Sequence, residues 1–407
     1  MQMKDVLTFI MAGGKGERLM PLTRDRAKPA VPFGGIYRII DFTLSNCVNS
    51  GIRKIHVLAQ YKSISLARHL WMGWNIFESE LAEYIDIIHP QQRIDEHWYQ
   101  GTADSVYQNL YSIEMENPEY VLILAGDHIY KMNYAQMAEA HARNGAEITV
   151  GLIKMPTSQA PVLGVAEMNE SGRIVKFVEK PKEARAIPGD PAHIYASMGI
   201  YFFNRSALAE DLMKDAEDPN SAHDFGKNIV PGAIQRRKVF GHLLKNPDGQ
   251  PGYWRDVGTV EAYFESNMDL VQVTPTFNLY DRSWPLRTYM GQYPPAKFLH
   301  AGADDPARIG MSTESIIPGG CIISGGRVAR CVLSPNVRIN SFSEVSDSVL
   351  MEGVNVGRYA KVRRAIIDKD VQIPPNTVIG YDPVEDRKRF TVTESGLIVV
   401  AKGTILS

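Results

Sequence analysis

The chain has few of the features that mark secreted, membrane-spanning or nucleic-acid-binding proteins. Its three cysteines, Cys47, Cys321 and Cys331, are too few for a disulfide framework, and none has a metal-ligand spacing. No apolar run in the sequence approaches the roughly 20 residues that a membrane-spanning helix needs. With 44 basic and 46 acidic residues the charge is nearly balanced, which argues against nucleic acids or membranes as partners. We therefore expect a cytoplasmic enzyme that acts on small molecules.

What the chain does contain is a glycine-rich turn after a short apolar run. Residues 6–12 predict a buried strand, not a signal peptide, and lead into Gly13, Gly14, Lys15 and Gly16. Glycines at such a turn leave amide N–H groups exposed with no Cβ in the way. Four cations follow closely, namely Arg18, Arg24, Arg26 and Lys28. Together they predict a polyphosphate site, although a plain strand-to-helix turn with solvated cations would contain the same glycines.

The turn fits neither of the two common phosphate-binding motifs. A P-loop closes on Gly-Lys-Ser/Thr, whereas Lys15 is followed by Gly16. The dinucleotide fingerprint needs a third glycine where this chain has Leu19. A phosphate site of another kind is therefore expected.

Apolar strands alternate with helical segments through the first two-thirds of the chain. We expect helices over 38–51, 63–71 and 103–115, and strands over 55–59, 84–88 and 120–128. This alternation predicts an α/β fold with a doubly wound, mainly parallel, Rossmann-like sheet. Ligands bind such sheets at the carboxyl ends of the strands, where both the glycine turn and Asp127 would lie.

Two acids, Asp127 and Asp256, stand in settings that suit a metal ion. Asp127 ends a continuous apolar strand, and Asp256 lies in a short block between Tyr253 and Thr259. Mg²⁺ is usually held by one or two carboxylates together with substrate phosphates. We therefore expect Asp127 and Asp256 to bind Mg²⁺, although an aspartate at a strand end can also cap the next turn. The adjacent His128 is expected to be structural.

The last third of the chain repeats every 17 residues. One column of the repeat contains Ile322, Ile339, Val356 and Ile373, and another contains Val328, Val345, Val362 and Ile379. The same register holds Gly319, Asn336, Gly353 and Asp370, residue types that tolerate left-handed turns. Stacked coils of a parallel β-helix require such columns, and the pattern resembles left-handed β-helices built from imperfect hexapeptides. An ordinary sandwich with chance periodicity is the alternative.

These patterns divide the chain into three parts. Residues 1–274 are expected to form a catalytic domain, and the proline- and aromatic-rich residues 275–306 an interdomain linker. Residues 307–407 are expected to form the β-helix, which would act as a scaffold for assembly and regulation.

The order of the sequence blocks resembles that of bacterial glucose-1-phosphate adenylyltransferases over nearly the whole chain. The matching blocks include GGKGERL from residue 13, RAKPAV from 26, WYQGTAD from 98, AGDHIY from 125 and YWRDVGT from 253. The resemblance implies that ATP and glucose 1-phosphate form ADP-glucose and pyrophosphate, the committed step toward glycogen. It also implies a homotetramer and allosteric control by sugar phosphates or adenylates.

The resemblance also implies a role for each matching residue. Arg18 and Lys28 would bind the ATP phosphates and stabilise the leaving pyrophosphate, while Asp127 and Asp256 hold Mg²⁺. Glucose 1-phosphate would contact Tyr99, Gly164, Glu179, Lys180 and Ser197. ATP would also contact Gly13, Gly14, Lys15, Gly16, Gly101, Thr102 and Ala103. Effectors would contact Arg26 and Arg38.

The chain departs from the enteric branch of this family at its effector positions. That branch has a lysine for fructose 1,6-bisphosphate where this chain has Asp25, and an AMP-contacting histidine where it has Pro32. It also has an arginine in the helix where this chain has Glu114 and Met115. We therefore expect fructose 1,6-bisphosphate to activate weakly or not at all, and AMP to inhibit less than in that branch. A different effector, such as fructose 6-phosphate or pyruvate, would be the activator.

Three other functions stay open at this point. A nucleotidyltransferase for another base or sugar would share the glycine turn and the acids. A non-catalytic regulatory subunit of the same fold would be expected to lack Arg18, Lys28 or Asp127, and all three are present. An acyltransferase would need a catalytic base in the repeat, where no histidine stands in an obvious setting.

Overall fold

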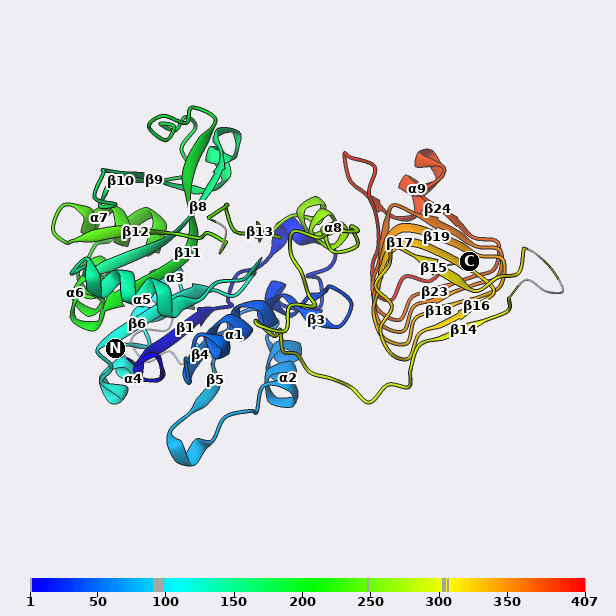
Figure 1. Cartoon of the computed structure of the whole chain (residues 1–407), viewed down its shortest axis with the longest axis horizontal. Helices are drawn as coiled ribbons and strands as arrows, with labels where there is room; N and C mark the ends of the chain where they lie inside the picture. Colours follow the sequence, from blue (N-terminus) through cyan, green and yellow to red (C-terminus); the bar gives the residue numbers. More distant parts are fainter. Residues whose placement is uncertain (1, 91–97, 247–248, 302–304, 306, 407) are drawn as a thin grey trace. The chain divides into compact units, whose positions relative to one another are not determined.

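The computed structural model describes residues 2–90, 98–246, 249–301, 305 and 307–406 (Figure 1). It divides into two compact units, of which the first is Met1–Gly14 with Phe42–Trp254 and the second is Lys15–Asp41 with Arg255–Ser407. Helix α1 (Ile39–Asn49) and strand β13 (Trp254–Asp256) carry the chain from one unit to the other. Among the described residues, no helix is both long and apolar enough to cross a membrane. Parts of the expected linker, residues 302–304 and 306, lie outside the described residues.

Within the described residues, the first unit is built on a nine-stranded sheet of order β10-β9-β11-β6-β1-β4-β5, with β8 paired to β11 and β12. Its strands are β1 (Leu7–Met11), β4 (Lys54–Leu58), β5 (Tyr84–Ile88), β6 (Tyr120–Ala125), β8 (Ile148–Pro156), β9 (Gly164–Met168), β10 (Ile174–Glu179), β11 (His193–Asn204) and β12 (Val239–Leu243). Strands β6, β1, β4 and β5 are parallel, whereas β11 runs antiparallel to its neighbours β6, β8 and β9. The expected mainly parallel sheet is therefore present, with an antiparallel extension.

Helices flank this sheet because the parallel strands are apolar on both faces. In β6, the four residues Val121–Leu124 are fully buried. Helix α5 packs on β8, β11 and β12, and α6 packs on β6 and β11. The helices of this unit are α2 (Ile64–Gly73), α3 (Thr102–Tyr107), α4 (Leu110–Glu116), α5 (Tyr134–Arg143), α6 (Arg205–Ala216), the π-helix Phe225–Ile229 and α7 (Val230–Ile234). The packing leaves the strand ends and their loops to form a site.

The second unit contains the coils of the β-helix, drawn from yellow to red in Figure 1. One of its sheets contains β14 (Lys297–Leu299), β16 (Ile322–Ser324), β18 (Arg338–Ile339), β20 (Asn355–Val356) and β23 (Gln372–Ile373). The other contains β15 (Met311–Thr313), β17 (Arg327–Leu333), β19 (Glu344–Leu350), β21 (Lys361–Arg363), β22 (Ala365–Ile367), β24 (Val378–Ile379), β25 (Thr391–Val392) and β26 (Ile398–Val400). The unit also holds β2 (Pro32–Phe33), β3 (Tyr37–Arg38), α8 (Val260–Asp269) and α9 (Pro383–Arg389).

The stacking of the coils confirms one predicted column and corrects the other. Val328, Val345, Val362 and Ile379 pair in sequence through parallel strands. In the other column Ile339 pairs with Ile323, not with Ile322. The left-handed turn of that first coil is at Gly320, with φ +78°, not at Gly319. The first coil is thus one residue shorter than the later ones, so Ile323 is the residue that reaches the interior.

Candidate active site

The glycine-rich turn is tight at both of its ends. A Cβ on Gly13 would lie 3.2 Å from the Cβ of Gln60. Gly16 has φ +64°, a conformation that favours glycine. The Thr23 hydroxyl donates a hydrogen bond of 2.8 Å to the Gly16 carbonyl, which fixes the turn against the following segment. Lys15 is exposed and lies 3.9 Å from Glu17.

Three of the predicted residues come together in the second unit. The Lys28 ammonium lies 2.9 Å from one carboxylate oxygen of Asp256, and a guanidinium nitrogen of Arg18 lies 3.9 Å from the other. Lys28 is buried, with 7% of its surface exposed, whereas the Arg18 side chain is 64% exposed. A buried ammonium requires a partner to offset its desolvation, and Asp256 supplies it. Arg18 is left with most of its surface accessible to an anion.

Asp127 lies in the first unit, between β6 and β7 (His128–Tyr130). The turn before it depends on Gly126, because a Cβ there would lie 2.8 Å from the Ile10 side chain and 3.1 Å from the Met11 carbonyl oxygen. Asp127 lies 3.6 Å from a ring nitrogen of His128. The His128 ring meets Trp254 edge to face at 4.9 Å between centroids.

Glu179 is the last residue of β10, and Lys180 follows it. Their charged groups are 2.9 Å apart, and the Lys180 side chain is about half exposed. A Cβ on either Gly164 or Gly226 would lie 2.7 Å from the Glu179 carboxylate. Main chain without side chains therefore holds this carboxylate on two sides. The Glu179 carboxylate thus lies close to the main chain, beside the half-exposed ammonium of Lys180.

Ser197 lies on β11 at a break in its pairing with β8. The register shifts between Ser197 and Tyr201, and Gly199 within the shift has φ +67°. The Ser197 hydroxyl accepts a hydrogen bond of 3.3 Å from the Gly199 amide. Irregularities of this kind re-aim side chains and are common beside active sites. Tyr201 stacks on Phe225 with 5.3 Å between ring centroids.

The segment around Asp224, which the sequence pattern did not single out, packs against the residues expected to contact ATP. The Thr102 hydroxyl donates a bond of 3.0 Å to Asp224, and the Ala103 amide donates one of 2.7 Å to the His223 carbonyl. A Cβ on Gly101 would lie 2.2 Å from the same His223 carbonyl oxygen. Asp224 also caps the π-helix, because it accepts bonds from two of its amides. An aspartate followed by Phe-Gly was the signal that could have identified this cap.

Tyr99 is half-buried beside α4. Its hydroxyl accepts a hydrogen bond of 3.0 Å from the Asn109 side-chain amide. Burial raises the pKa of Tyr99, so the phenol stays protonated and can donate a hydrogen bond. Its backbone carbonyl accepts a long bond of 3.5 Å from Gln60, the residue that also contacts Gly13.

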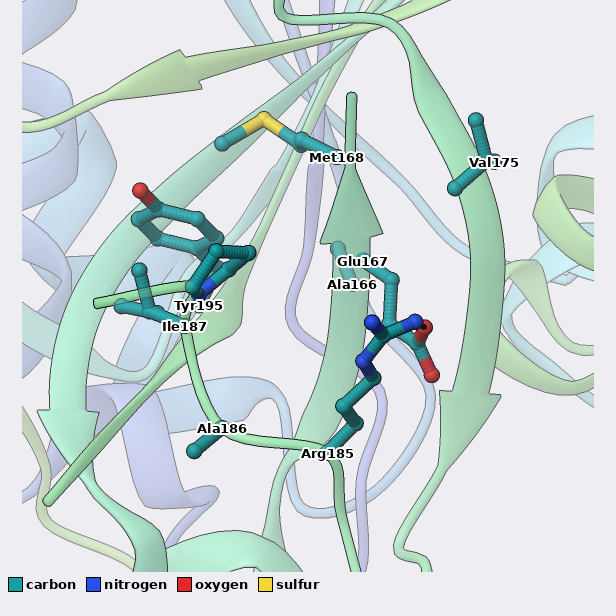
Figure 2. Close-up of a pocket in the computed structure, with 9 residues that line it drawn as sticks. Ala166, Glu167, Met168, Val175, Arg185, Ala186, Ile187 and Tyr195 are labelled. Atoms are coloured by element: carbon teal, nitrogen blue, oxygen red, sulfur yellow. Dashed lines mark ion pairs between the residues drawn. The ribbon is translucent and has the colours of Figure 1, made fainter. Parts of the chain in front are cut away.

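A cavity of about 110 Å³ lies on the strand hairpin that carries Gly164 and Glu179 (Figure 2). Figure 2 shows Arg185 beside Glu167, and Tyr195 and Ile187 on the other side. Glu167 lies 3.2 Å from Lys176 and 3.7 Å from Arg185, so its charge is already compensated. Ligand sites for small molecules usually measure roughly 300–1,000 Å³. This cavity is therefore too small for a sugar phosphate.

The two expected effector residues differ in their surroundings. The Arg26 guanidinium donates two bonds of 2.8 and 2.9 Å to Asp368, and both side chains are buried. Arg38 follows on β3, and its amide donates a bond of 2.7 Å to Asp41. The pKa of Arg38 is lowered by burial, and the nearby Asp41 only partly opposes this effect. Arg24 pairs with the adjacent Asp25 at 3.2 Å.

Comparisons with known proteins agree with this geometry. A family model described as nucleotidyl transferase matches residues 7–273, and one described as GlmU-like, C-terminal hexapeptide matches residues 294–400. A glucose-1-phosphate adenylyltransferase of Koribacter versatilis is 54% identical over 404 residues, which cover 98% of this chain and 96% of the relative. The chain belongs to the family of glucose-1-phosphate adenylyltransferases.

Other members of this family are similarly close. The glucose-1-phosphate adenylyltransferase of Rhodopirellula baltica is 54% identical over 408 residues, covering 100% of this chain and 92% of the relative. That of Methylococcus capsulatus is 52% identical over 398 residues, covering 98% and 93%. The predicted fold, a nucleotidyltransferase sheet followed by a left-handed β-helix of hexapeptide repeats, is therefore confirmed. The protein is a nucleotidyltransferase.

Proposed function

We propose that this protein transfers the adenylyl group of ATP to glucose 1-phosphate, giving ADP-glucose and pyrophosphate in the first committed step of glycogen synthesis. The observation that carries the proposal is the 54% identity to a glucose-1-phosphate adenylyltransferase over nearly the whole chain. The Lys28–Asp256 ion pair beside Arg18 supports it, since these are groups that such a reaction needs.

On this proposal the glycine turn and its cations bind ATP. The amides of Gly13, Gly14, Lys15 and Gly16 face the phosphates, and Arg18 and Lys28 neutralise them. As the bond to the α-phosphorus breaks, negative charge moves onto the leaving pyrophosphate, and fixed cations stabilise that charge. The base lies against Gly101, Thr102 and Ala103, which the Asp224 segment holds in place.

Asp127 and Asp256 are the proposed ligands of Mg²⁺. Both are carboxylates, the donors that this hard cation prefers, and two of them leave coordination positions for phosphate oxygens. Held by these carboxylates, the cation would offset the negative charge of the phosphates. The ammonium of Lys28 holds one Asp256 oxygen in position at 2.9 Å. Asp127 is positioned by the turn at Gly126.

Glucose 1-phosphate is proposed to bind at the ends of β9, β10 and β11. Glu179, held between Gly164 and Gly226, accepts hydrogen bonds from sugar hydroxyls. Lys180 neutralises the sugar phosphate as a point charge. Tyr99 and Ser197 supply hydroxyl groups. The phosphate oxygen then attacks the α-phosphorus in line and, being already anionic, needs no general base.

We also propose the organisation of the whole protein. Residues 1–274 form the catalytic domain, 275–306 the linker and 307–407 a β-helix that serves assembly into a homotetramer. Sugar-phosphate or adenylate effectors act near Arg26 and Arg38. The three cysteines are buried free thiols, which fits a cytoplasmic location, where thiols stay reduced.

Pyrophosphate release from a panel of nucleoside triphosphates and sugar 1-phosphates tests the proposal. We expect kcat/KM for ATP with glucose 1-phosphate to be at least about tenfold higher than for every other pair. This ratio corresponds to a difference of about 1.4 kcal/mol in activation free energy. Preference for another base or sugar would show that the protein is a nucleotidyltransferase for that base or sugar. No release with any pair would favour a non-catalytic regulatory subunit.

A further inference from the structure

The second unit holds a cavity of about 810 Å³ that none of the roles above uses. One side is lined by α8 and the residues that follow it, and the other by corners of successive β-helix coils. Its volume falls within the roughly 300–1,000 Å³ typical of small-molecule sites. The apolar residues of its lining lie on the α8 side, and the arginines lie on the coil side.

The coil side presents a column of charged residues in an unusual backbone conformation. Glu314, Arg330, Asp347 and Arg364 have φ values of +47°, +50°, +46° and +50°. The left-handed region costs a residue with a side chain about 1–2 kcal/mol relative to glycine. Glycine, asparagine or aspartate normally take such corners, so two arginines there need another reason. A function of the arginine side chains in the cavity would be such a reason.

An ion pair neutralises the charges at one end of this column, at Arg330 and Asp347, but not the arginines at the other end. Arg330 and Asp347 form a bidentate pair at 2.6 and 2.8 Å. Among the residues that the structure describes, no carboxylate oxygen lies within 4.0 Å of Arg363 or Arg364. Arg363 donates only to the Gly380 carbonyl, at 3.4 Å, and Arg364 only to the Ser395 carbonyl, at 3.5 Å. Since a guanidinium has five N–H donors, both can still bind an anion.

The α8 side of the cavity combines an apolar surface with the polar side chains of Glu265 and Gln272. Phe264, Met268 and Val271 line it, and the Arg364 guanidinium lies 5.8 Å from the Phe264 ring centroid. At the cationic end, a Cβ on Gly396 would meet nothing within 4 Å, so the cavity is open there. We propose that this cavity binds a small organic oxyanion, with its charged group on Arg363 and Arg364 and an apolar or flat body against α8.

Such a ligand would contact an element that leads directly to the active site. Helix α8 begins after its cap, Thr259, three residues beyond Asp256. The helix also packs on β17 and β19 of the β-helix. Binding is therefore expected to change the turnover number, a consequence that rests on the proposed function. The binding of the oxyanion does not rest on the proposed function, and it is measured without substrates.

Calorimetric titration of the full chain with phenyl phosphate tests the site. We expect one ligand per chain and at least tenfold weaker binding in the double variant Arg363→Gln, Arg364→Gln. Inorganic phosphate, which lacks the apolar body, and benzyl alcohol, which lacks the charge, are each expected to bind at least tenfold more weakly. Arg338→Gln, an exposed arginine on β18 that bonds to Asn340 at 3.0 Å, is the matched control and should bind as the wild type does.

Two results would overturn the proposal. Unchanged phenyl phosphate binding in the double variant would show that Arg363 and Arg364 are not its anchors. Loss of binding in Lys180→Ala instead would place the ligand in the sugar-phosphate site. Because these arginines are at the surface of the coils, thermal unfolding should be unchanged in the double variant. Met268→Gln should weaken phenyl phosphate but not inorganic phosphate, which separates the apolar contact from the charge.

Discussion

Lys28 and Asp256 show how much of the site depends on single charges. Lys28 has 7% of its surface exposed, so its ammonium is held in a poorly hydrated place with the Asp256 carboxylate 2.9 Å away. An uncompensated charge in such a place is strongly disfavoured. The pair forms without a substrate, so a phosphate or metal ion bound at the proposed site would meet groups that are already oriented.

Asp127→Asn is expected to lower turnover by at least about a hundredfold without changing the fold. The substitution keeps the shape of the side chain but removes the charge proposed to hold Mg²⁺. Pyrophosphate release at saturating Mg²⁺, with circular dichroism alongside, measures the effect. Asp86→Asn, at an exposed position on β5, is the control. Turnover like that of the wild type would remove Asp127 from the metal site.

Lys180→Ala should weaken one substrate selectively. Loss of a charged hydrogen bond to the sugar phosphate costs about 2 kcal/mol, so the KM for glucose 1-phosphate should rise by about thirtyfold while that for ATP stays nearly constant. Initial-rate kinetics with each substrate varied in turn give both values. The nearby exposed Lys182 provides the control variant, Lys182→Ala. Equal weakening of both substrates would contradict the placement of Lys180.

At the scale of elements, strands formed by apolar runs could be predicted from the sequence, whereas a break within a helix could not. Strand β5 has the predicted bounds, 84–88, because five extended residues between polar segments leave little choice. The helix expected over 103–115 is instead α3 and α4, separated at Gln108 and Asn109. Asn109 donates hydrogen bonds to the Ser105 carbonyl and the Tyr99 hydroxyl. That tertiary contact leaves no periodic trace in the sequence.

The candidate site divides in the same way. The glycine turn and Asp127 follow apolar runs, so sequence alone could single them out as candidates. The Asp224 segment could not be placed, because its partner Thr102 is 122 residues away. The pairing of Arg26 with Asp368 spans 342 residues and was equally hidden. Contacts of this range depend on the folded chain and not on local pattern.

Arg26→Ala should destabilise the second unit strongly. The change leaves the Asp368 carboxylate, which is 2% exposed, buried without its partner, and removing one member of a buried pair costs about 3–5 kcal/mol. We expect a clear fall in the midpoint of thermal unfolding. Arg24→Ala, which removes a half-exposed partner of Asp25, should cost at most about 1 kcal/mol. Similar midpoints for the two variants would refute this account of Arg26.

Strand β12 should contribute to acid sensitivity through His242. Burial lowers the pKa of His242 to about 4, and the nearby Arg143 acts in the same direction. An unfolded histidine titrates near 6.5, so the unfolded chain takes up the proton first, and stability falls as the pH drops from about 6.5 to 4. His242→Gln should therefore lose less stability between pH 7 and pH 4.5.

Urea unfolding at the two pH values measures this difference, with His89→Gln, at an exposed position, as the control. The effect should be reduced and not abolished, because burial also lowers the pKa of His56 and His141. An identical loss of stability in His242→Gln and the wild type would exclude His242 as a contributor.

At the scale of the whole molecule, the residues around Arg24 bear on regulation. The Asp25 carboxylate lies 3.2 Å from the Arg24 guanidinium and directly precedes the expected effector residue Arg26 in the sequence. Repulsion between the carboxylate and a phosphate a few ångströms away is about 1 kcal/mol even in water. We therefore expect fructose 1,6-bisphosphate to activate this protein weakly or not at all, with fructose 6-phosphate or pyruvate as better activators.

Titration of each effector into the forward assay checks this expectation. Asp25→Lys should gain a response to fructose 1,6-bisphosphate, because it replaces the repelling charge with an attracting one. Asp218→Lys, at an exposed position in the first unit, controls for the change in net charge. Strong activation of the wild type by low concentrations of fructose 1,6-bisphosphate would show that Asp25 does not govern the response.

The grouping of residues 15–41 with the β-helix has a consequence for how the protein is made. Arg26 leaves the ribosome early, but its partner Asp368 follows 342 residues later. At about 5–20 residues per second, that interval lasts roughly 20–70 s. During this time residues 15–41 lack the coils against which they pack in the folded chain. A chain that ends before Asp368 never supplies the partner of Arg26. Synthesis of the carboxyl-terminal coils therefore sets the time at which this segment near the amino terminus can be completed.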